Sequence, residues 1–552
     1  MTGAQVILEC LKQEEVSVIF GYPGATIAPF YDALVLDGTI RHILVRQEQN
    51  AGHAASGYSR ASGKVGVCCT TSGPGATNLI TGLATAYMDS IPMVALTGQV
   101  RSDLLGRDVF QEADITGACE PFTKHSYLAT DTQELPRIIK EAFHIASTGR
   151  PGPVLIDLPQ DTLEREFQGE FKYPDSVDII GYKPRIKGHP LQMKRAIDAI
   201  ERANRPIICA GGGVVSAKAR RELIKFAERL DIPVVSTLMG VGMMPTEHPL
   251  YMGMLGSHGI FSANYGIHHA DLVILCGARV GDRAMAKPDQ VAKKAEIIHI
   301  DIDPAEIGKN MRADIPIVGD IRLVLKSITE KCEEYSHKDW VDDLKQKKAE
   351  HTPVFRSIPG QVDPRNFMRT LSEEVSKRAK AILVADVGEN QIWSANNFAF
   401  KGGRFLTSGG LGTMGYSLGA ALGAKIAKPE RQVFAVCGDG SFQMMMCELA
   451  TLMQHDIPVK VVIMQNNRLG MVRELQDKIY GGRYSGVMLD GSPDFVKLAQ
   501  AYGIASERID EDSDVNAAID RMLSCNAPYV LVCRVAEDIP SRQEDCKGGC
   551  ER

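Results

Sequence analysis

Two oxygen-bearing side chains in the C-terminal part of the chain stand where two short apolar runs end. Asp439 follows the run 432–436 in the stretch Cys437-Gly438-Asp439-Gly440-Ser441, and Asn466 follows the run 459–464. The spacing of 27 residues is about one strand–helix–strand unit, which brings both side chains to the edge of a parallel sheet where ligands bind. Carboxylate and amide oxygens there suit Mg²⁺, which commonly bridges to phosphate. A strand-end Asp that caps the next helix, with a turn Asn, is the structural alternative.

A glutamate and a glycine-rich turn form a second candidate group near the N-terminus. Glu48 follows the apolar run 42–45, and the small residues at 52 and 54–57 allow close backbone packing. The turn 71–75, Thr-Ser-Gly-Pro-Gly, runs into a helical pattern whose N-terminus is suited to face a ligand. Taken alone, Glu48 also fits an ordinary strand-end glutamate with a surface or ion-paired role.

The elements that must position these residues repeat along the whole chain. Short apolar runs alternate with amphipathic helical segments, a pattern that predicts parallel sheets covered by helices. The runs form three blocks: 16–20, 42–45, 65–69, 92–96 and 153–158; then 206–210, 232–236, 272–276 and 296–302; then 381–386, 432–437, 459–464 and 529–533. Polar connectors at about 165–190 and 332–364 separate them. We therefore expect three doubly wound parallel-sheet α/β domains, at residues 1–170, 188–332 and 362–540, joined by exposed linkers.

Composition excludes several classes of protein. Of 552 residues, 44% are apolar and 24% charged, and the net charge of −6 disfavours a nucleic-acid binder. No apolar run reaches the roughly 18 residues of a membrane span, and charges in the first 20 residues argue against a signal peptide, so we expect a cytoplasmic protein. Cys546 and Cys550 favour a frayed tail over a metal clip. Five of the thirteen cysteines lie in apolar runs and are expected to be buried: Cys68, Cys69, Cys209, Cys276 and Cys437.

The Gly-Asp-Gly stretch, its spacing to Asn466 and the glutamate near the N-terminus together resemble the thiamine-diphosphate enzymes. Over about residues 1–535 the chain is similar to the acetohydroxyacid synthase (acetolactate synthase) family, at 48–50, 71–78, 86–92, 110–112, 149–154, 253–256, 300–310, 407–412 and 469–472. The resemblance implies an enzyme with thiamine diphosphate, Mg²⁺ and FAD that decarboxylates pyruvate. The remaining two-carbon unit would pass to a second 2-oxo acid, giving 2-acetolactate or 2-aceto-2-hydroxybutyrate, in the first common step of branched-chain amino-acid biosynthesis.

The resemblance also implies the residues of the thiamine-diphosphate site. Glu48 would hydrogen-bond the pyrimidine ring and so activate the cofactor. The side chains of Asp439 and Asn466 would hold Mg²⁺, together with the backbone carbonyl of Arg468. The other expected cofactor contacts are Val387, Gly388, Glu389, Asn390, Gly412, Met414, Gly440, Ser441, Leu469, Gly470 and Met471.

In the second block, a run of three glycines follows a strand pattern and lets a backbone approach phosphate. The resemblance implies that this domain binds FAD, through Arg150, Gly211, Gly212, Gly213, Thr237, Leu238, Met239, Leu255, Gly256, Ser257, His258, Gly277, Ala278, Arg279, Arg283, Asp301, Ile302, Gly319 and Asp320. It also implies a catalytic pocket lined by Phe110, Gln111, Arg283, Met414, Val472 and Leu475, in which Arg283 would pair with a substrate carboxylate.

Several residues depart from the family pattern. The loop 23–26, Gln160 and the run 281–283 differ from the usual residues. Glu389, followed by Asn390, stands where Gln-His is common; its negative charge beside phosphate either weakens cofactor binding or points away. Leu475 replaces a tryptophan of biosynthetic relatives, and this bears on the preference between pyruvate and 2-oxobutyrate.

Other functions and the assembly stay open at the level of sequence. The alternatives are another thiamine-dependent 2-oxo acid lyase or oxidase, a NAD-linked oxidoreductase and a non-catalytic binding protein. The GxGxxG at 410–415 lacks the acidic residue a dinucleotide fingerprint needs about 20 residues on. The family implies a homodimer or homotetramer, because Glu48 and Asp439 of one site come from different chains, and a possible small regulatory subunit.

Overall fold

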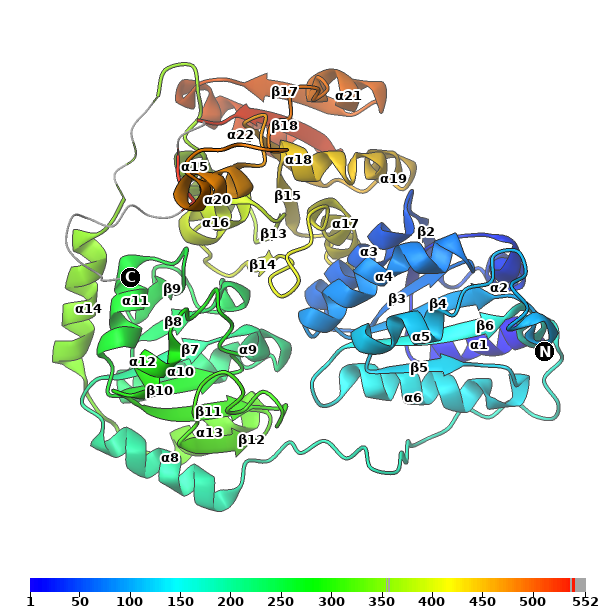
Figure 1. Cartoon of the computed structure of the whole chain (residues 1–552), viewed down its shortest axis with the longest axis horizontal. Coiled ribbons are helices and arrows are strands. Elements are labelled where there is room, and N and C mark those ends of the chain that lie inside the picture. The colour runs from blue at the N-terminus through cyan, green and yellow to red at the C-terminus, as the bar shows by residue number, and fades with distance from the viewer. Residues whose placement is uncertain (354, 356–357, 537–538, 542–552) are drawn as a thin grey trace.

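Three parallel six-stranded sheets, each covered by helices, form the three lobes of the molecule (Figure 1). The structure is a computed structural model that describes residues 1–353, 355, 358–536 and 539–541; Cys546 and Cys550 lie outside these residues. Every strand pair in the three sheets is parallel, which confirms the predicted α/β class. Among the described residues, no helix is long and apolar enough to cross a membrane.

The first sheet has the strand order β2-β1-β3-β4-β6-β5. Its strands are β1 (Val18–Tyr22), β2 (Arg41–Leu44), β3 (Gly66–Thr70), β4 (Met93–Gln99), β5 (His125–Leu128) and β6 (Pro153–Pro159). The helices that cover it are α1 (Gly3–Gln13), α2 (Ala28–Asp37), α3 (Glu48–Ser62), α4 (Pro74–Met88), α5 (Ile115–Cys119), α6 (Leu135–Ser147) and α7 (Gln160–Glu164).

The middle sheet has a different order, β12-β11-β10-β7-β8-β9. Its strands are β7 (Pro206–Ala210), β8 (Val234–Ser236), β9 (Tyr251–Met254), β10 (Leu272–Cys276), β11 (Glu296–Asp301) and β12 (Ile315–Val318). Its helices are α8 (Pro190–Arg202), α9 (Gly212–Ser216), α10 (Arg220–Leu230), α11 (Phe261–His269), α12 (Pro288–Ala292) and α13 (Ile321–Lys331). Taken in chain order within this block, the sheet reads 3-2-1-4-5-6, the order of dinucleotide-binding folds.

The third sheet, β14-β13-β15-β16-β18-β17, repeats the order of the first. Its strands are β13 (Ala381–Ala385), β14 (Arg404–Leu406), β15 (Gln432–Gly438), β16 (Lys460–Gln465), β17 (Ala505–Ile509) and β18 (Tyr529–Arg534). Its helices are α15 (Pro364–Ser376), α16 (Glu389–Asn397), α17 (Ser417–Ala427), α18 (Asp439–Gln443), α19 (Leu449–Gln454), α20 (Gly470–Tyr480), α21 (Phe495–Ala501) and α22 (Val515–Ser524).

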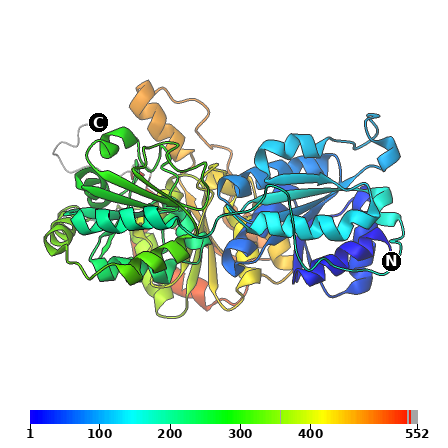
Figure 2. The ribbon, with the colours of Figure 1, turned by 90° about the horizontal axis from the view of Figure 1, so that it is seen from below.

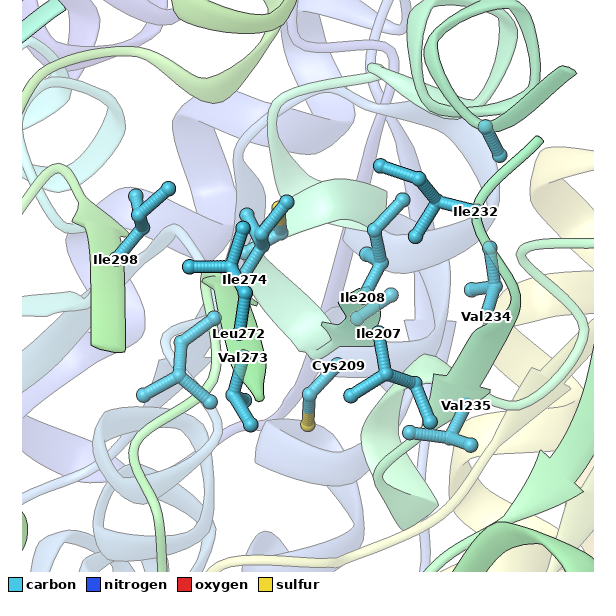
Figure 3. Close-up of a cluster of buried hydrophobic side chains, with 14 of the residues drawn as sticks. Ile207, Ile208, Cys209, Ile232, Val234, Val235, Leu272, Val273, Ile274 and Ile298 are labelled. Atoms are coloured by element: carbon cyan, nitrogen blue, oxygen red, sulfur yellow. The ribbon is translucent and has the colours of Figure 1, made fainter. Parts of the chain in front are cut away.

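The sheets are built on apolar strands that are buried on both faces. Figure 3 shows this for the middle sheet, where Ile207, Val234, Val273 and Ile298 of four strands lie in one fully buried cluster. Parallel strands covered on both faces read as continuous apolar runs, which is why the sequence locates them. The five cysteines predicted to be buried in such runs are all buried and free.

The first and third domains share one hydrophobic core, because α3 packs directly on α17. A side chain at Gly57 would collide with the backbone of Ala420, and one at Gly423 would collide with the backbone of Ala54. The two helix backbones therefore touch only because these positions are glycine. This confirms the close packing predicted from the small residues after Glu48.

The two polar connectors differ in structure. Residues 165–189 form no helix and run along the outside of the molecule from the first domain to the middle one (Figures 1 and 2). The second connector was expected to be an exposed linker, and this is wrong for α14 (Lys338–Glu350). That helix buries Val341 and Leu344 on the middle domain, and the Trp340 indole donates to the Pro206 carbonyl at 3.0 Å.

Candidate cofactor site

A cavity of about 1070 Å³ opens at the carboxyl ends of the middle and third sheets. Residues 88–90 and 147–151 of the first domain complete its wall. From the third domain it is lined by Val387, Gly388, Glu389, Asn390, Gly412, Met414, Asp439, Gly440, Ser441, Asn466, Arg468, Leu469, Gly470, Met471, Val472 and Leu475. These are all the site residues that the sequence predicts in that domain.

The predicted metal ligands lie together at one end of this cavity. The ends of β15 and β16 are neighbours, with Gly438 paired to Met464, so Asp439 and Asn466 follow adjacent strand ends. The buried Asp439 carboxylate accepts hydrogen bonds from the backbone N–H groups of Gly440 (3.0 Å) and Asn467 (2.6 Å). Burial raises the pKa of Asp439 to about 6. A carboxylate, an amide oxygen and a backbone carbonyl are the donors that Mg²⁺ prefers, so these residues fit that ion.

Glu389 points into the same end of the cavity. Its carboxylate accepts a hydrogen bond from the Asn466 amide at 3.0 Å, and a side chain at Gly470 would collide with it. Burial, together with the nearby carboxylates of Glu474 and Asp439, raises the pKa of Glu389 to about 8. The sequence left open whether Glu389 points toward the phosphate region or away from it. In the structure it points toward the predicted phosphate region. The neighbouring Glu474 was missed, because one glutamate within a helical stretch carries no sequence signal.

Two helix N-termini also face this end of the cavity. Helix α16 begins at Glu389 and α20 begins at Gly470, and both first residues line the cavity. The N-cap of α16 is Gly388, whose φ of 142° favours glycine. Unpaired N–H groups at helix N-termini attract anions, so this end of the cavity is suited to a diphosphate held with a divalent cation.

The other end of the cavity lies at the point where the strand order of the middle sheet reverses. There β7 and β10 are neighbours, and the glycine loops after them touch, since a side chain at Gly211 would meet the Gly277 carbonyl. Asp301 ends the next strand, and burial raises the pKa of its carboxyl to about 6. Open α/β sheets of this order bind dinucleotides at such a crevice, which fits FAD.

Most of the residues predicted to contact FAD line this part of the cavity. They are Arg150, Gly212, Gly213, Thr237, Leu238, Met239, Leu255, His258, Gly277, Ala278, Arg279, Arg283, Asp301, Ile302 and Asp320. Four predicted contacts are not among the lining residues: Gly211, Gly256, Ser257 and Gly319. Gly211 and Gly256 instead allow close approach of neighbouring backbone, at Gly277 and Arg283.

Carboxylates that were not predicted from the sequence bind two segments of the cavity wall. The Arg150 guanidinium pairs with Glu306 at 2.8 Å and with Asp303 at 3.3 Å. Asp89 accepts the backbone N–H groups of Gly410 (2.7 Å) and Gly409 (3.3 Å), and so fixes the glycine-rich turn before Gly412. Both groups fall in segments that carry the family resemblance, 86–92 and 300–310, and this is the only signal that points to them.

Three predicted catalytic residues, Glu48, Phe110 and Gln111, do not line the cavity. Glu48 is the first residue of α3, and its carboxylate accepts a hydrogen bond from the Asn78 amide at 3.0 Å. Gln111 lies with its backbone against Gly73, just before α4, and Phe110 is 87% exposed. Glu48 and Gln111 are partly exposed, so these three residues form an outward-facing group around the start of α4. They lie outside the cavity and are separate from its metal end, the end at which Asp439 and Asn466 lie.

Comparison with known proteins finds one matching family model in each of the three sheet regions. Three family models match the chain: the N-terminal TPP binding domain of thiamine pyrophosphate enzymes at residues 1–118, their central domain at 193–328 and their C-terminal TPP binding domain at 386–533. The chain is 48% identical to the "Probable acetolactate synthase large subunit" of Methanocaldococcus jannaschii, over 98% of this chain and 93% of the relative. The chain belongs to the acetolactate synthase family of thiamine pyrophosphate enzymes.

Other members of the acetolactate synthase family are similar over comparable lengths. The "Acetolactate synthase large subunit" of Corynebacterium glutamicum is 45% identical, over 98% of this chain and 87% of the relative. The "Probable acetolactate synthase large subunit" of Methanococcus aeolicus is 46% identical, over 96% and 91%. The family expected from the motifs is confirmed, and it is a family of thiamine-pyrophosphate-dependent enzymes.

Proposed function

We propose that the chain is the catalytic subunit of an acetolactate synthase. It releases carbon dioxide from pyruvate and transfers the two-carbon unit to a second 2-oxo acid, giving 2-acetolactate or 2-aceto-2-hydroxybutyrate, the first common step of branched-chain amino-acid biosynthesis. The observation that carries this proposal is a single cavity that joins an oxygen-lined metal end to a dinucleotide crevice. The names of the relatives support the same reaction.

Three cofactors belong to this proposal. Thiamine diphosphate would supply the carbon nucleophile, while FAD would be structural, because the net reaction transfers no electrons. Asp439, Asn466 and the backbone carbonyl of Arg468 would hold Mg²⁺ against the diphosphate. The match to thiamine pyrophosphate binding domains supports the first cofactor, and the strand order of the middle sheet supports FAD.

Residues of the cavity and of the outward-facing group would together contact the cofactor and the substrates. Glu48 would accept a hydrogen bond from the pyrimidine ring, in the orientation that Asn78 helps to fix. The guanidinium of Arg283 would pair with the carboxylate of the second 2-oxo acid. Its side chain is 81% exposed beside the cavity, which supports that reach. Phe110, Gln111, Met414, Val472 and Leu475 would form the pocket walls.

The assembly would be a homodimer or homotetramer. Asp439 lies inside the cavity of this chain whereas Glu48 lies outside it, so a second copy that supplies Glu48 and Gln111 would complete each site. A small regulatory subunit is a further partner, since relatives are named as large subunits. We also propose a cytoplasmic location, no nucleic-acid partner, and domains at residues 1–170, 188–332 and 362–540.

The test is to identify the products formed from pyruvate, with and without 2-oxobutyrate, by the chain loaded with thiamine diphosphate, Mg²⁺ and FAD. Acetolactate, together with 2-aceto-2-hydroxybutyrate when both acids are present, is the expected result. Acetaldehyde without acetolactate, or oxygen consumption that matches pyruvate loss, would instead favour another lyase or an oxidase on this scaffold.

A further inference from the structure

The carboxylate of Glu112 bonds back to the backbone of the loop that carries Phe110 and Gln111. Glu112 accepts hydrogen bonds from the backbone N–H of Gly106 and, at 3.1 Å, from that of Val109. The backbone N–H of Glu112 in turn donates to the Val109 carbonyl at 3.0 Å. Residues 106–112 therefore form a compact loop around a single side chain.

Two residues of this loop adopt a conformation that L-residues rarely take. Asp108 has a φ of 52° and Gln111 a φ of 60°. Such residues persist only where surrounding contacts over-determine them. The Glu112 carboxylate accepts hydrogen bonds from residues on both sides of Asp108. The backbone N–H of Glu112 bonds to the Val109 carbonyl, and this bond spans Phe110 and Gln111.

The position of Gln111 is coupled to the outward-facing group around α4. A side chain at Gly73 would approach the Gln111 Cα to 2.9 Å, so the two backbones touch. Gly73 is the N-cap of α4, and Asn78 on that helix donates to Glu48. The loop thus stands in direct contact with the element that orients the predicted cofactor-activating glutamate.

The far end of the loop is fastened to the sheet separately. The Gln99 amide, at the end of β4, donates to the Ala113 carbonyl at 2.8 Å and to the buried carboxylate of Asp157 in β6 at 2.9 Å. Asp114 then caps α5 by accepting the N–H of Gly117 at 2.9 Å. These contacts hold residues 113–117, whereas the hydrogen bonds that the structure shows within 106–112 all involve Glu112.

We propose that Glu112 is a positioning residue for catalysis: it holds the loop so that Phe110 and Gln111 are presented, already ordered, to the cofactor of a second copy of the chain. This rests on the proposed function. Preorganisation matters here because Phe110 projects into solvent, where a mobile loop would have to be ordered at each encounter with substrate.

The test compares Glu112→Ala and Glu112→Gln with the unsubstituted chain, all as full-length protein with cofactors. Asp108→Asn is the matched control, because it removes one exposed charge from the same loop and asparagine tolerates positive φ. Backbone hydrogen exchange over 105–112 reports the loop without reference to any product. Steady-state kinetics with pyruvate report kcat and KM, and thermal unfolding reports global stability.

For Glu112→Ala we expect exchange over 105–112 to rise by about tenfold and kcat/KM to fall by about tenfold, the factor that one net hydrogen bond to a charged group is worth. For Glu112→Gln, exchange and kcat/KM should lie between the values of the natural chain and of Glu112→Ala, since glutamine keeps one acceptor oxygen. The Tm of both variants should stay unchanged. Unchanged exchange in Glu112→Ala, faster exchange with normal kcat/KM, or an equal loss in Asp108→Asn would each overturn the proposal. A natural chain that forms no acetolactate would count against the proposed function, while the exchange measurement would still decide the anchoring.

Discussion

The metal end and the outward-facing group are two halves of one proposed site, built in opposite ways. Asp439 and Asn466 are 1% and 8% exposed and lie within a cavity, whereas Phe110 is 87% exposed on a surface loop. The first half is assembled by two neighbouring strands of a single sheet. The second is assembled by a loop and two helix starts and lies outside that cavity. Under the proposed function, one chain would bind the phosphate end of the cofactor and a second chain would supply the outward-facing group.

The largest test of this comparison removes the proposed activating carboxylate. Glu48→Gln should lower acetolactate formation by about 10²–10⁴-fold, the usual contribution of a positioned acid–base group, while leaving cofactor affinity intact. Turnover is measured at saturating thiamine diphosphate and Mg²⁺, and affinity by calorimetry. Glu120→Gln, an exposed glutamate of the same domain, is the control. A loss below about tenfold would remove Glu48 from this role.

Removing a proposed metal ligand should instead weaken cofactor binding. Asp439→Ala should weaken Mg²⁺-dependent binding of thiamine diphosphate by on the order of a hundredfold, because even residues that merely support metal ligands are worth 10–100-fold in affinity. Calorimetric titration at several Mg²⁺ concentrations measures it. Asp490→Ala, at an exposed acid in the same domain, should bind as the natural chain does. Identical Mg²⁺ dependence in both variants would contradict the assignment.

Mixing the two inactive variants tests whether the halves come from different chains. Coexpression of Glu48→Gln and Asp439→Ala should restore about a quarter of the natural activity, since half of randomly formed dimers are hybrids and each holds one intact site. The coexpressed mixture is assayed for acetolactate against each variant alone, and doubly tagged hybrids purified from it should show about half of the natural activity. Hybrids as inactive as their parents would mean that both residues act from the same chain.

The sequence located the inner strands and missed most of the edges. The runs at 206–210 and 272–276 coincide with β7 and β10, which are buried on both faces. The strands with no predicted run are β5, β9, β12, β14 and β17, and all five lie at the edge of a sheet. An edge strand such as β5 is partly exposed along its length, so it needs no continuous apolar run and leaves no signal.

The candidate site shows a similar limit. Motif and strand-end reasoning found Asp439 and Asn466 because their positions follow from the sheet itself. It assigned no role to the carboxylates that contact other site residues, such as Glu306 on Arg150 or Glu474 beside Glu389, because those contacts join segments far apart in the sequence. Strand-end reasoning could not place Glu48 outside the cavity either, since that depends on how domains pack; only the family resemblance implied that Glu48 and Asp439 of one site come from different chains.

The smallest expected effect concerns Leu475, where the two halves would meet around the second substrate. Leu475 lines the cavity one turn from Val472 on α20 and is 49% exposed, so it offers little apolar contact to an extra methyl group. One methylene in an apolar pocket discriminates by about 1–3 kcal/mol, and a half-exposed wall should fall near the lower figure. The natural chain should therefore show little preference for 2-oxobutyrate over a second pyruvate, and Leu475→Trp should raise that preference by about tenfold. The product ratio in a competition assay measures this, with Ile479→Trp as control, because Ile479 lies on the same helix and is not among the residues that line the cavity. A natural chain that already favours 2-oxobutyrate tens-fold, or a tryptophan at 475 without effect, would show that this wall does not contact the second substrate.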